Sequence, residues 1–376
     1  MAGIYIHIPF CKQACSYCDF HFSTKLDAKT EVLNCLKKEL VNRRNYLGSE
    51  TVKSIYLGGG TPSLLAVEEL NELIRIVDAN FQVDNEVEIT LEANPDDLSK
   101  DYLKSLKDSK INRLSIGIQS FYDTDLKFMH RAHDRKQALQ SLEDAVKLQF
   151  TNINVDLIFG SPTTSMHMWQ ENLDIFSDFG IKHLSAYSLT VENKTLLQHQ
   201  IKTNQISALN ELTVFEQYEY LQDFISKNHY EQYEVSNYSK SGNYAVHNSN
   251  YWLDEHYLGI GPSAHSYDGN SRQWNISNNN LYIKKVKNRE IYHEKESLSE
   301  VDKYNEYLIN SLRTKWGIHL SKIKRRFSDQ IVTHFNRQMS LLSSDIVSLS
   351  DEHLIVRNEK LFQSDEIVRQ LMLDED

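Results

Sequence analysis

The chain is poor in three features that would each point to a particular class of protein. It has four cysteines in 376 residues, too few for a framework of disulfides, and it has no run of about 18 apolar residues that could cross a membrane. It also lacks an excess of positive charge, because 41 Lys and Arg face 52 Asp and Glu, giving a formal net charge of −11. We therefore expect no nucleic-acid partner for the chain as a whole.

The first residues also lack the basic region and long apolar stretch of a secretory signal peptide, so we expect a cytoplasmic protein. Hydrophobic residues make up 40% of the chain and charged residues 25%. This composition supports a sizeable core and excludes a mainly disordered or coiled-coil chain. The length favours one large domain accompanied by a smaller one.

Short β-rich segments alternate with helical patterns through residues 1–200. The expected strands are Gly3–Ile8, Val52–Leu57, Val87–Leu91, Arg113–Ile118, Asn152–Ile158 and His183–Ser188. The helical patterns lie near 28–47, 66–80, 99–109, 123–149 and 167–179. This alternation predicts an α/β fold with a parallel sheet, as either an open barrel or a doubly wound sheet.

Beyond this core the pattern changes, and we expect three parts in the chain. Residues 1–200 form the core, 201–295 extend it through a Tyr-, Ser- and Asn-rich stretch, and 296–376 form a small, mainly helical domain. Segments 209–228 and 298–313 have the spacing of amphipathic helices. Cys35 lies in the first helical pattern, and we interpret it as a packing residue because free cysteines are commonly buried.

The other three cysteines are crowded into the string Cys11-Lys-Gln-Ala-Cys15-Ser-Tyr-Cys18, directly after the first expected strand. Such crowding in a reducing compartment indicates a metal site. A zinc site would need a fourth ligand, for which His7 and His21 are the nearby candidates. A [4Fe–4S] cluster held by three cysteines instead keeps one iron open to a small chelating molecule.

This C-x3-C-x2-C spacing, with Tyr17 before the last cysteine, resembles the signature of radical S-adenosylmethionine (SAM) proteins. The string Tyr5-Ile-His-Ile-Pro-Phe-Cys11 is similar to the subfamily of oxygen-independent coproporphyrinogen III oxidase (HemN) and the heme chaperone HemW. The resemblance implies a partial (β/α)6 radical-SAM barrel with a smaller, HemN-like C-terminal domain. It also implies that Cys11, Cys15 and Cys18 hold a [4Fe–4S] cluster. The open iron of that cluster binds SAM, which the reduced cluster cleaves to methionine and a 5′-deoxyadenosyl radical.

A glycine run, Leu57-Gly58-Gly59-Gly60-Thr61-Pro62, follows the second expected strand. Successive glycines have no side chains, so the backbone can approach a ligand closely. By the resemblance, Gly59, Gly60 and Thr61 hold the amino group of SAM.

Four more polar residues lie at or just beyond expected strand ends, where a parallel barrel has its mouth. They are Glu92, Gln119, Asp156 and, in the helical region after Gln119, Arg131. The resemblance implies that Tyr5 and Glu92 contact SAM, Glu92 at its ribose or amino group. Gln119, Arg131 and Asp156 match oxidase positions that contact a second SAM. The alternative is that Glu92, Arg131 and Asp156 only neutralise one another.

Two features depart from the oxidase. Phe20 stands where the oxidase has a fourth cysteine, and the first strand begins at once, without the extension that handles substrate in the oxidase. A third feature, His247-Asn248-Ser-Asn-Tyr251-Trp252, resembles the H-N-x-x-Y-W motif of HemW-type heme chaperones.

Histidine can ligate heme iron, and aromatic rings can stack on a porphyrin. We therefore expect His247, Asn248, Tyr251 and Trp252 to form a heme site, with His256 and His265 as alternative ligands. The favoured function is a heme chaperone that carries a cluster and SAM and passes heme to an acceptor protein. The alternatives are coproporphyrinogen III oxidation and radical SAM chemistry on another substrate.

Membrane respiratory enzymes are candidate acceptors for such a chaperone, and a heme donor to them must reach the membrane surface at least briefly. The amphipathic C-terminal segments and the basic cluster Lys322-Ile-Lys-Arg-Arg326 are the candidates for that contact. The ordinary interpretation is that the helices pack on the core and that the basic residues are solvated.

Overall fold

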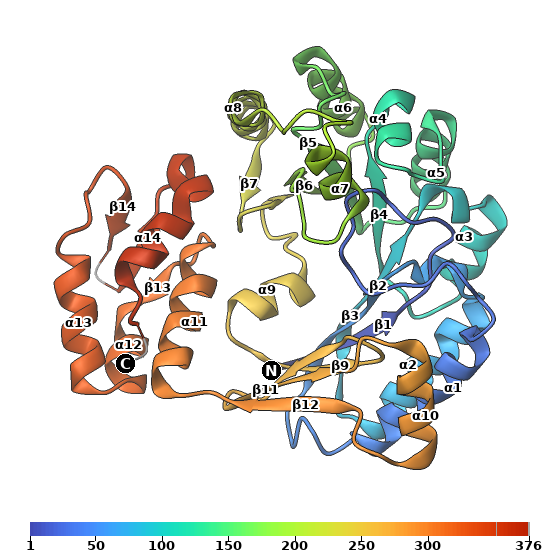
Figure 1. Cartoon of the computed structure of the whole chain (residues 1–376), viewed down its shortest axis with the longest axis horizontal. Helices are drawn as coiled ribbons and strands as arrows, with labels where there is room; N and C mark the ends of the chain where they lie inside the picture. The colour runs from blue at the N-terminus through green and yellow to red at the C-terminus, as the bar shows by residue number, and fades with distance from the viewer. Residues whose placement is uncertain (351, 375–376) are drawn as a thin grey trace.

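The computed structural model describes residues 1–350 and 352–374, and its main feature is one large, open sheet (Figure 1). The twelve strands follow the order β12-β11-β10-β9-β1-β2-β3-β4-β5-β6-β8-β7. The six central strands are parallel and lie in chain order. They are β1 (Ala2–Ile8), β2 (Val52–Gly59), β3 (Val83–Ala93), β4 (Arg113–Gln119), β5 (Ile153–Phe159) and β6 (His183–Ser188). The predicted α/β fold with a parallel sheet is confirmed, and each expected strand overlaps an observed one.

The helices between these strands lie along the outer side of the sheet (Figure 1). They are α1 (Lys29–Asn42), α2 (Val67–Asn80), α3 (Lys100–Lys107), α4 (Asp123–Phe128), α5 (Arg135–Lys147) and α6 (Met166–Asp178), with short 3-10 turns η1 (Pro62–Leu64) and η2 (Pro95–Asp97). Apolar residues at helical spacing, such as Leu33, Leu36 and Leu40 on α1, are buried in the shared core. The sheet does not close into a barrel, because the outer edges of β1 and β6 pair with β9 and β8.

The helical pattern expected at 123–149 is two helices, α4 and α5, and this prediction was therefore wrong in its continuity. His130 has a φ of 54°, in the left-handed region that an α-helix does not use. The side chain of Asp134 then accepts from the backbone N–H of Gln137 and caps the start of α5. Arg131 consequently lies in the connection between the helices and not within one.

Residues after β6 add strands to both edges of the sheet. The added elements are α7 (Leu196–Lys202), α8 (Glu211–Lys227), β7 (Tyr230–Gln232), β8 (Asn237–Lys240), α9 (Val246–Trp252), β9 (His256–Ile260), β10 (His265–Tyr267), β11 (Ser271–Asn275), α10 (Asn279–Asn288) and β12 (His293–Ser297). β7 and β8 extend the β6 edge, whereas β9 pairs in parallel with β1 and leads to β10, β11 and β12. The chain therefore crosses from one edge of the sheet to the other through α9, which lies on the inner side of the sheet (Figure 1).

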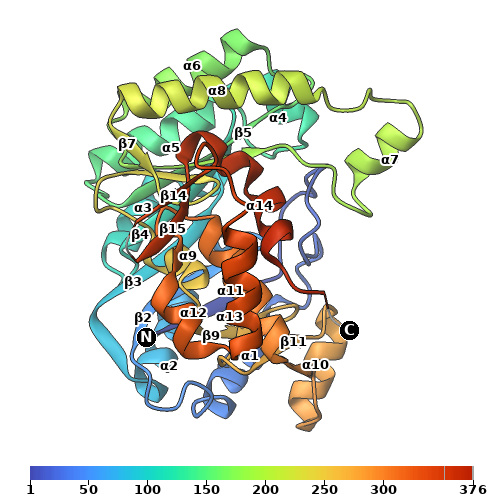
Figure 2. The same cartoon turned by 90° about the vertical axis from the view of Figure 1, so that its left-hand side faces the viewer.

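The C-terminal part has a separate apolar core and a small sheet of its own, in the order β13-β15-β14. Its elements are α11 (Glu300–Leu312), β13 (Ile318–His319), α12 (Leu320–Arg326), α13 (Asp329–Met339), β14 (Val347–Leu349), β15 (His353–Val356), η3 (Asn358–Gln363) and α14 (Ser364–Leu371). Ion pairs join it to the large sheet, including Arg272 with Glu306 at 3.0 Å and Arg326 with Asp254. Figure 2 shows these helices in front of the large sheet.

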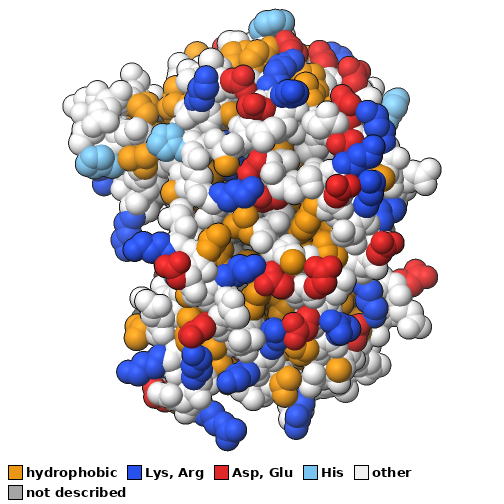
Figure 3. All heavy atoms as spheres, turned by 90° about the vertical axis from the view of Figure 1, so that its right-hand side faces the viewer, with side chains coloured by type: hydrophobic (Ala, Val, Ile, Leu, Met, Phe, Trp, Pro, Cys, Tyr) orange, Lys and Arg blue, Asp and Glu red, His pale blue; other side chains and the backbone are white. Residues whose placement is uncertain are grey.

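On the face turned away from the C-terminal part, Lys and Arg side chains are interspersed with Asp and Glu (Figure 3). Among the described residues, we find no helix with the length and apolar character needed to cross a membrane.

Candidate functional site

The three crowded cysteines lie in the loop that links β1 to α1, at the C-terminal end of the parallel strands. Distant segments hold this loop on both sides: the N–H of Ser16 donates to the carbonyl of Met129 at 3.1 Å, and the N–H of Leu197 donates to the carbonyl of Ser16 at 2.8 Å. Tyr17 packs against the small apolar cluster that contains Met129 and Leu197. The loop is thus fixed while Cys11, Cys15 and Cys18 all stay partly exposed.

The spacing of the three sulfur atoms indicates which kind of metal centre they fit. Within the described part of the chain, the only trio of His, Cys, Asp or Glu ligand atoms within 4.8 Å of one another lies elsewhere, at His319, Glu352 and His353. One tetrahedral zinc ion with Zn–S bonds of about 2.3 Å would hold sulfurs only about 3.8 Å apart. The three cysteine sulfurs therefore do not all lie within 4.8 Å of one another, an arrangement compatible with a four-iron cluster, which takes each sulfur at a different iron.

The two histidines considered as a fourth zinc ligand are engaged elsewhere. His7 Nε2 lies 2.8 Å from the carbonyl of His21, and His7 Nδ1 lies 3.0 Å from the Tyr5 hydroxyl. His21 Nε2 lies 2.8 Å from Asn279 Oδ1. Burial raises the pKa of Cys11 to about 11 and that of Cys18 to about 12, so both thiols need a bound cation to ionise at neutral pH.

The glycine turn after β2 packs directly against the base of the cysteine loop. The N–H of Gly60 donates to the carbonyl of Ile8 at 2.9 Å, and a Cβ at Gly60 would lie 2.6 Å from the carbonyl oxygen of Phe10. Gly59 has a φ of 105°, and a Cβ there would lie 2.3 Å from His7 Nδ1. No other residue fits this approach, and the polar backbone of the turn is left beside the cysteines.

Glu92, at the end of β3, ties the glycine turn to the interior of the sheet. Its carboxylate accepts from the N–H of Gly59 at 3.0 Å and from the hydroxyl of Tyr56 at 2.7 Å. Burial, with a contribution from the nearby charge of Asp156, raises the pKa of Glu92 to about 7 despite these hydrogen bonds. The side chain remains partly accessible, so a ligand on the turn could reach it.

Arg131 and Gln119 meet above Gly117, on the far side of the mouth. Arg131 donates to Cys15 Sγ at 3.4 Å, to Asn94 Oδ1 at 2.7 Å and to the carbonyl of Gly117 at 2.9 Å. Its Nε is buried without a protein partner. A Cβ on Gly117 would lie 2.9 Å from Gln119 Nε2 and 3.1 Å from Arg131 Nη2. The Arg131 guanidinium therefore covers one cysteine and keeps one N–H free.

Asp156, on β5, is held by a different set of hydrogen bonds. It accepts from Asn154 at 2.6 Å and from Ser115 at 3.4 Å. Across the described residues, no ion pair joins Arg131 to Glu92 or Asp156, so mutual neutralisation is not what holds these side chains in place. Asn94 was missed from the sequence, although its polar side chain follows the end of β3 just before Pro95.

The H-N-x-x-Y-W residues lie on α9 and pack against the first residues of β1 and β2. His247 is 3% exposed, with Nδ1 2.8 Å from Ser54 Oγ and Nε2 3.3 Å from the Tyr251 hydroxyl. Its ring stacks on Tyr56 at 4.9 Å between centroids, and burial lowers its pKa to about 3. Tyr56 also binds Glu92, so one tyrosine contacts both the α9 histidine and the carboxylate at the glycine turn.

The remaining predicted residues are more accessible. Asn248, Tyr251 and Trp252 are partly exposed, His256 lies 3.6 Å from Glu50, and the exposed His265 stacks on Trp274. Thr61, at the end of the glycine turn, is buried and accepts from Asn94 at 3.2 Å. Cys35 is buried in α1, as predicted, with its sulfur 3.9 Å from the carbonyl of Ile283.

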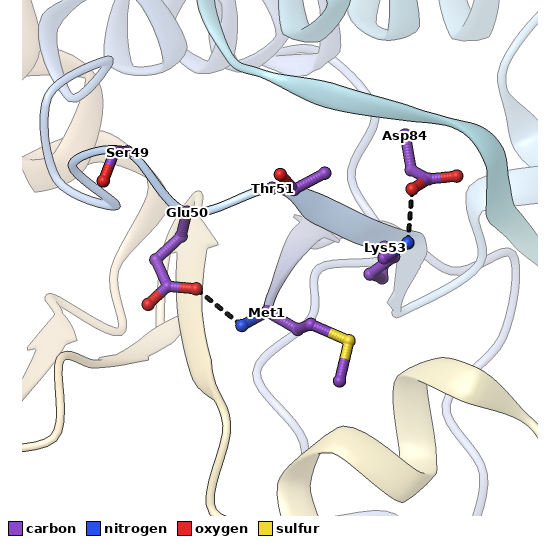
Figure 4. Close-up of a pocket in the computed structure, with 6 residues that line it drawn as sticks. All are labelled: Met1, Ser49, Glu50, Thr51, Lys53 and Asp84. Carbon is purple, nitrogen blue, oxygen red and sulfur yellow. Dashed lines mark hydrogen bonds and ion pairs between the residues drawn. The ribbon is translucent and has the colours of Figure 1, made fainter.

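A shallow pocket lies at the opposite end of the strands (Figure 4). The residues that line it are Met1, Ser49, Glu50, Thr51, Lys53 and Asp84. Its charges are already paired, with the Met1 amino group 2.6 Å from Glu50 and Lys53 against Asp84. None of the residues predicted to hold the cluster, SAM or heme lines it.

Comparison with solved structures supports the fold. Escherichia coli coproporphyrinogen III oxidase (HemN) superposes with a TM-score of 0.84 and 21% identity, over 98% of this chain and 89% of that one. At this identity the likeness establishes the shared architecture.

Comparison with sequences establishes the family. The model of the radical SAM superfamily matches residues 5–176. A Lactococcus lactis subsp. lactis (strain IL1403) protein named heme chaperone HemW is 31% identical, over 99% of this chain and 97% of that protein. The Bacillus subtilis (strain 168) protein of the same name is 32% identical, over 96% and 94%. This chain therefore belongs to the radical SAM superfamily and, within it, to the HemW family.

Proposed function

We propose that the chain is a heme chaperone of the radical SAM type, which binds a [4Fe–4S] cluster, SAM and heme and passes heme to an acceptor protein. Its full-length relatives named heme chaperone HemW support this function. The observation that carries the proposal is the position of α9, whose H-N-x-x-Y-W residues lie inside the same sheet that presents the cysteine loop. Phe20, 66% exposed where the oxidase has a fourth cysteine, favours the chaperone over the oxidase.

In this proposal Cys11, Cys15 and Cys18 hold the cluster and leave one iron to the amino and carboxylate groups of SAM. When bound and reduced, the cluster supplies the electron that cleaves SAM. The residues proposed to hold SAM are Tyr5, Gly59, Gly60, Thr61 and Glu92, with Gln119, Arg131 and Asp156 for groups farther across the mouth. The glycine backbone gives the ligand room, and Glu92 offers a carboxylate to a cationic group beside that turn.

The pH dependence of SAM binding tests the role of Glu92. Its pKa of about 7 means that the carboxyl group of the SAM-free chain is largely protonated at pH 6 and ionised at pH 8. Binding SAM favours the carboxylate, because the SAM sulfonium is cationic and the iron-bound amino group, although neutral, still donates hydrogen bonds. We therefore expect affinity to rise by about tenfold from pH 6 to pH 8. Calorimetric titration of the anaerobically reconstituted chain with SAM measures this change.

Glu92→Gln should bind SAM more weakly at pH 8 and lose most of the pH dependence. Glu86→Gln is the matched control, because Glu86 lies on the same strand but is exposed. An equal pH slope in Glu92→Gln and the unmodified chain would show that another group binds the cation.

For heme we propose a site formed by His247, Asn248, Tyr251 and Trp252, with His256 and His265 as alternative ligands. Both ring nitrogens of His247 are hydrogen-bonded inside the sheet, so ligation of heme iron by this residue requires α9 to move outward. Tyr251 and Trp252 are the last two residues of α9 and are partly exposed, so a porphyrin could contact them before α9 moves.

The runner-up is oxidative decarboxylation of coproporphyrinogen III, which the shared fold with HemN allows. Two anaerobic assays on one reconstituted sample separate the functions. We expect a stable heme Soret band after desalting and transfer of that heme to an apo-enzyme, with no protoporphyrinogen from coproporphyrinogen III. Protoporphyrinogen formation would overturn the proposed function.

The proposed partners are heme and heme-requiring acceptors, membrane respiratory enzymes among them, and the proposed location is the cytoplasm with brief contact at the membrane surface. Of the basic cluster on α12, Lys322 and Arg326 are directed to Asp254. Lys324 and Arg325 are exposed, Arg325 with its Nε hydrogen-bonded to the carbonyl of Ser321, and both side chains could meet an anionic surface.

A further inference from the structure

Two histidines and a glutamate converge in the C-terminal part, far from the cysteine loop in the fold. β13 and β15 pair antiparallel, with His319 directly opposite His353. Directly opposed residues project from the same face, and the two imidazole rings lie 4.6 Å apart between centroids. His319 Nε2 lies 3.6 Å from Glu352 Oε2, and the three ligand atoms lie within 4.8 Å of one another.

Neighbouring groups hold these side chains in the orientation that a metal ligand needs. His353 Nδ1 lies 3.0 Å from the carbonyl of Trp316, which can only accept. That nitrogen therefore carries the proton, and His353 Nε2 keeps a free lone pair. His319 Nδ1 lies 3.2 Å from Ser321 Oγ, which leaves Nε2 facing Glu352. Histidines that ligate metals are commonly held in this way through their other ring nitrogen.

The backbone fixes Glu352 as well. The N–H of Leu320, the first residue of α12, donates to the carbonyl of Glu352 at 2.8 Å, just beyond the last paired residues of β13 and β15. Two basic side chains of α12, Lys322 and Arg326, are directed to Asp254 in the turn between α9 and β9.

We propose that His319, His353 and Glu352 form a binding site for a divalent transition-metal ion of the Zn²⁺ class. Two imidazoles and one carboxylate are a donor set that Zn²⁺ accepts at about 2.0–2.2 Å, with a fourth position left for water. Ligands of such an ion lie about 3.4 Å apart, and the 3.6 Å between His319 Nε2 and Glu352 Oε2 is already near that value. Small side-chain rotations bring in His353.

The bound ion would link β13 to β15 through His319 and His353, which are 34 residues apart in the sequence. This site is independent of the proposed heme function, because its donors contain no sulfur and none belongs to the cysteine loop, the glycine turn or α9.

The test adds Zn²⁺ to the full chain with its cluster reconstituted, so that the cysteines are occupied. Zinc per chain is counted after desalting, iron is counted in the same samples, and affinity is measured by competition with a chromophoric chelator. We expect the unmodified chain to bind one equivalent of zinc. The double variant His319→Ala/His353→Ala should lose this zinc, with its zinc affinity reduced at least 100-fold. X-ray absorption at the zinc edge should show nitrogen and oxygen neighbours and no sulfur.

His167→Ala is the matched control, since His167 is an exposed histidine on α6 and should keep the zinc equivalent. Glu352→Gln keeps the test decisive if the double variant fails to fold, because this side chain is 70% exposed and its replacement should only weaken affinity, by about tenfold. Sulfur neighbours around the zinc would overturn the proposal. So would a zinc affinity that is the same in the unmodified chain, in a folded double variant and in Glu352→Gln.

Discussion

Single replacement of Cys11, Cys15 or Cys18 by Ser is expected to remove nearly all cluster iron from the anaerobically reconstituted chain. In the proposed centre each sulfur binds a different iron, and the loop offers no fourth cysteine, because Phe20 stands at that position. Loss of an outer-shell partner already weakens metal binding by about 10- to 100-fold, so loss of a ligand should weaken it further. Iron and acid-labile sulfide per chain measure the effect.

Cys35→Ser is the control for this series. Cys35 is buried in α1, and its sulfur lies against the carbonyl of Ile283, so a serine there should leave the iron content unchanged. Iron retained in all three loop variants, or lost in a folded Cys35→Ser chain, would show that the ligand set is wrong. Zinc bound through the three loop cysteines, seen as sulfur neighbours in X-ray absorption at the zinc edge, would contradict the cluster itself.

Much of the fold can be predicted from the sequence because its signals are local. The six parallel strands read as short apolar runs, and their sides buried against the helices leave little choice of register. The glycine turn is predictable for the same reason, since three successive glycines directly follow an apolar strand. The structure adds the cause, because the close approach of Gly60 to Phe10 admits no side chain. The glycine run and the cysteine spacing are therefore visible before the fold is known.

The rest depends on contacts between segments far apart in the chain. β9 enters the sheet beside β1, more than 250 residues earlier, and no periodicity announces that pairing. Arg131 reads as part of a helix, yet the left-handed His130 ends α4 and leaves Arg131 to reach Cys15 and Asn94. The break itself leaves a signal, because residues 130–137 contain one apolar residue, Ala132, and end with the capping pair Asp134 and Gln137. The contacts of Arg131 with Cys15 and Asn94 leave none, because they join distant segments.

The motif on α9 shows the same limit. The sequence places a histidine among Tyr and Asn, a composition typical of a surface, whereas the fold buries His247 between Ser54 and Tyr56. Its hydrogen-bond partner lies 193 residues earlier in the chain. The chemistry of the motif is thus readable from its residues, but its accessibility is set by the strands around it.

We expect Glu88→Gln to speed heme uptake by about five- to 100-fold if His247 is the heme ligand. The Glu88 carboxylate accepts from the N–H groups of Val246 and His247, at 3.0 Å each, and so anchors the start of α9 to β3. Glutamine keeps the shape but turns one acceptor into an amide donor that faces an N–H. Loss of a hydrogen bond to a buried charge costs about 1–3 kcal/mol. This energy raises the population of chains with α9 released from the sheet by about five- to 100-fold. Stopped-flow absorption in the Soret region measures uptake.

Two further variants decide whether faster uptake reports on α9. Glu86→Gln changes an exposed carboxylate two residues away on β3 and should leave the rate unchanged. His247→Ala should lower heme affinity and alter the Soret band, while cluster iron stays the same, because His247 lies among the first residues of the strands and the cysteines lie beyond their other end. Two results together would show that heme binds without release of α9. In the first, Glu88→Gln folds with its cluster intact but takes up heme at the rate of the unmodified chain. In the second, His247→Ala keeps the Soret band of the unmodified chain. The exposed His265 would then be the first ligand to replace, because it can meet a porphyrin with α9 in place.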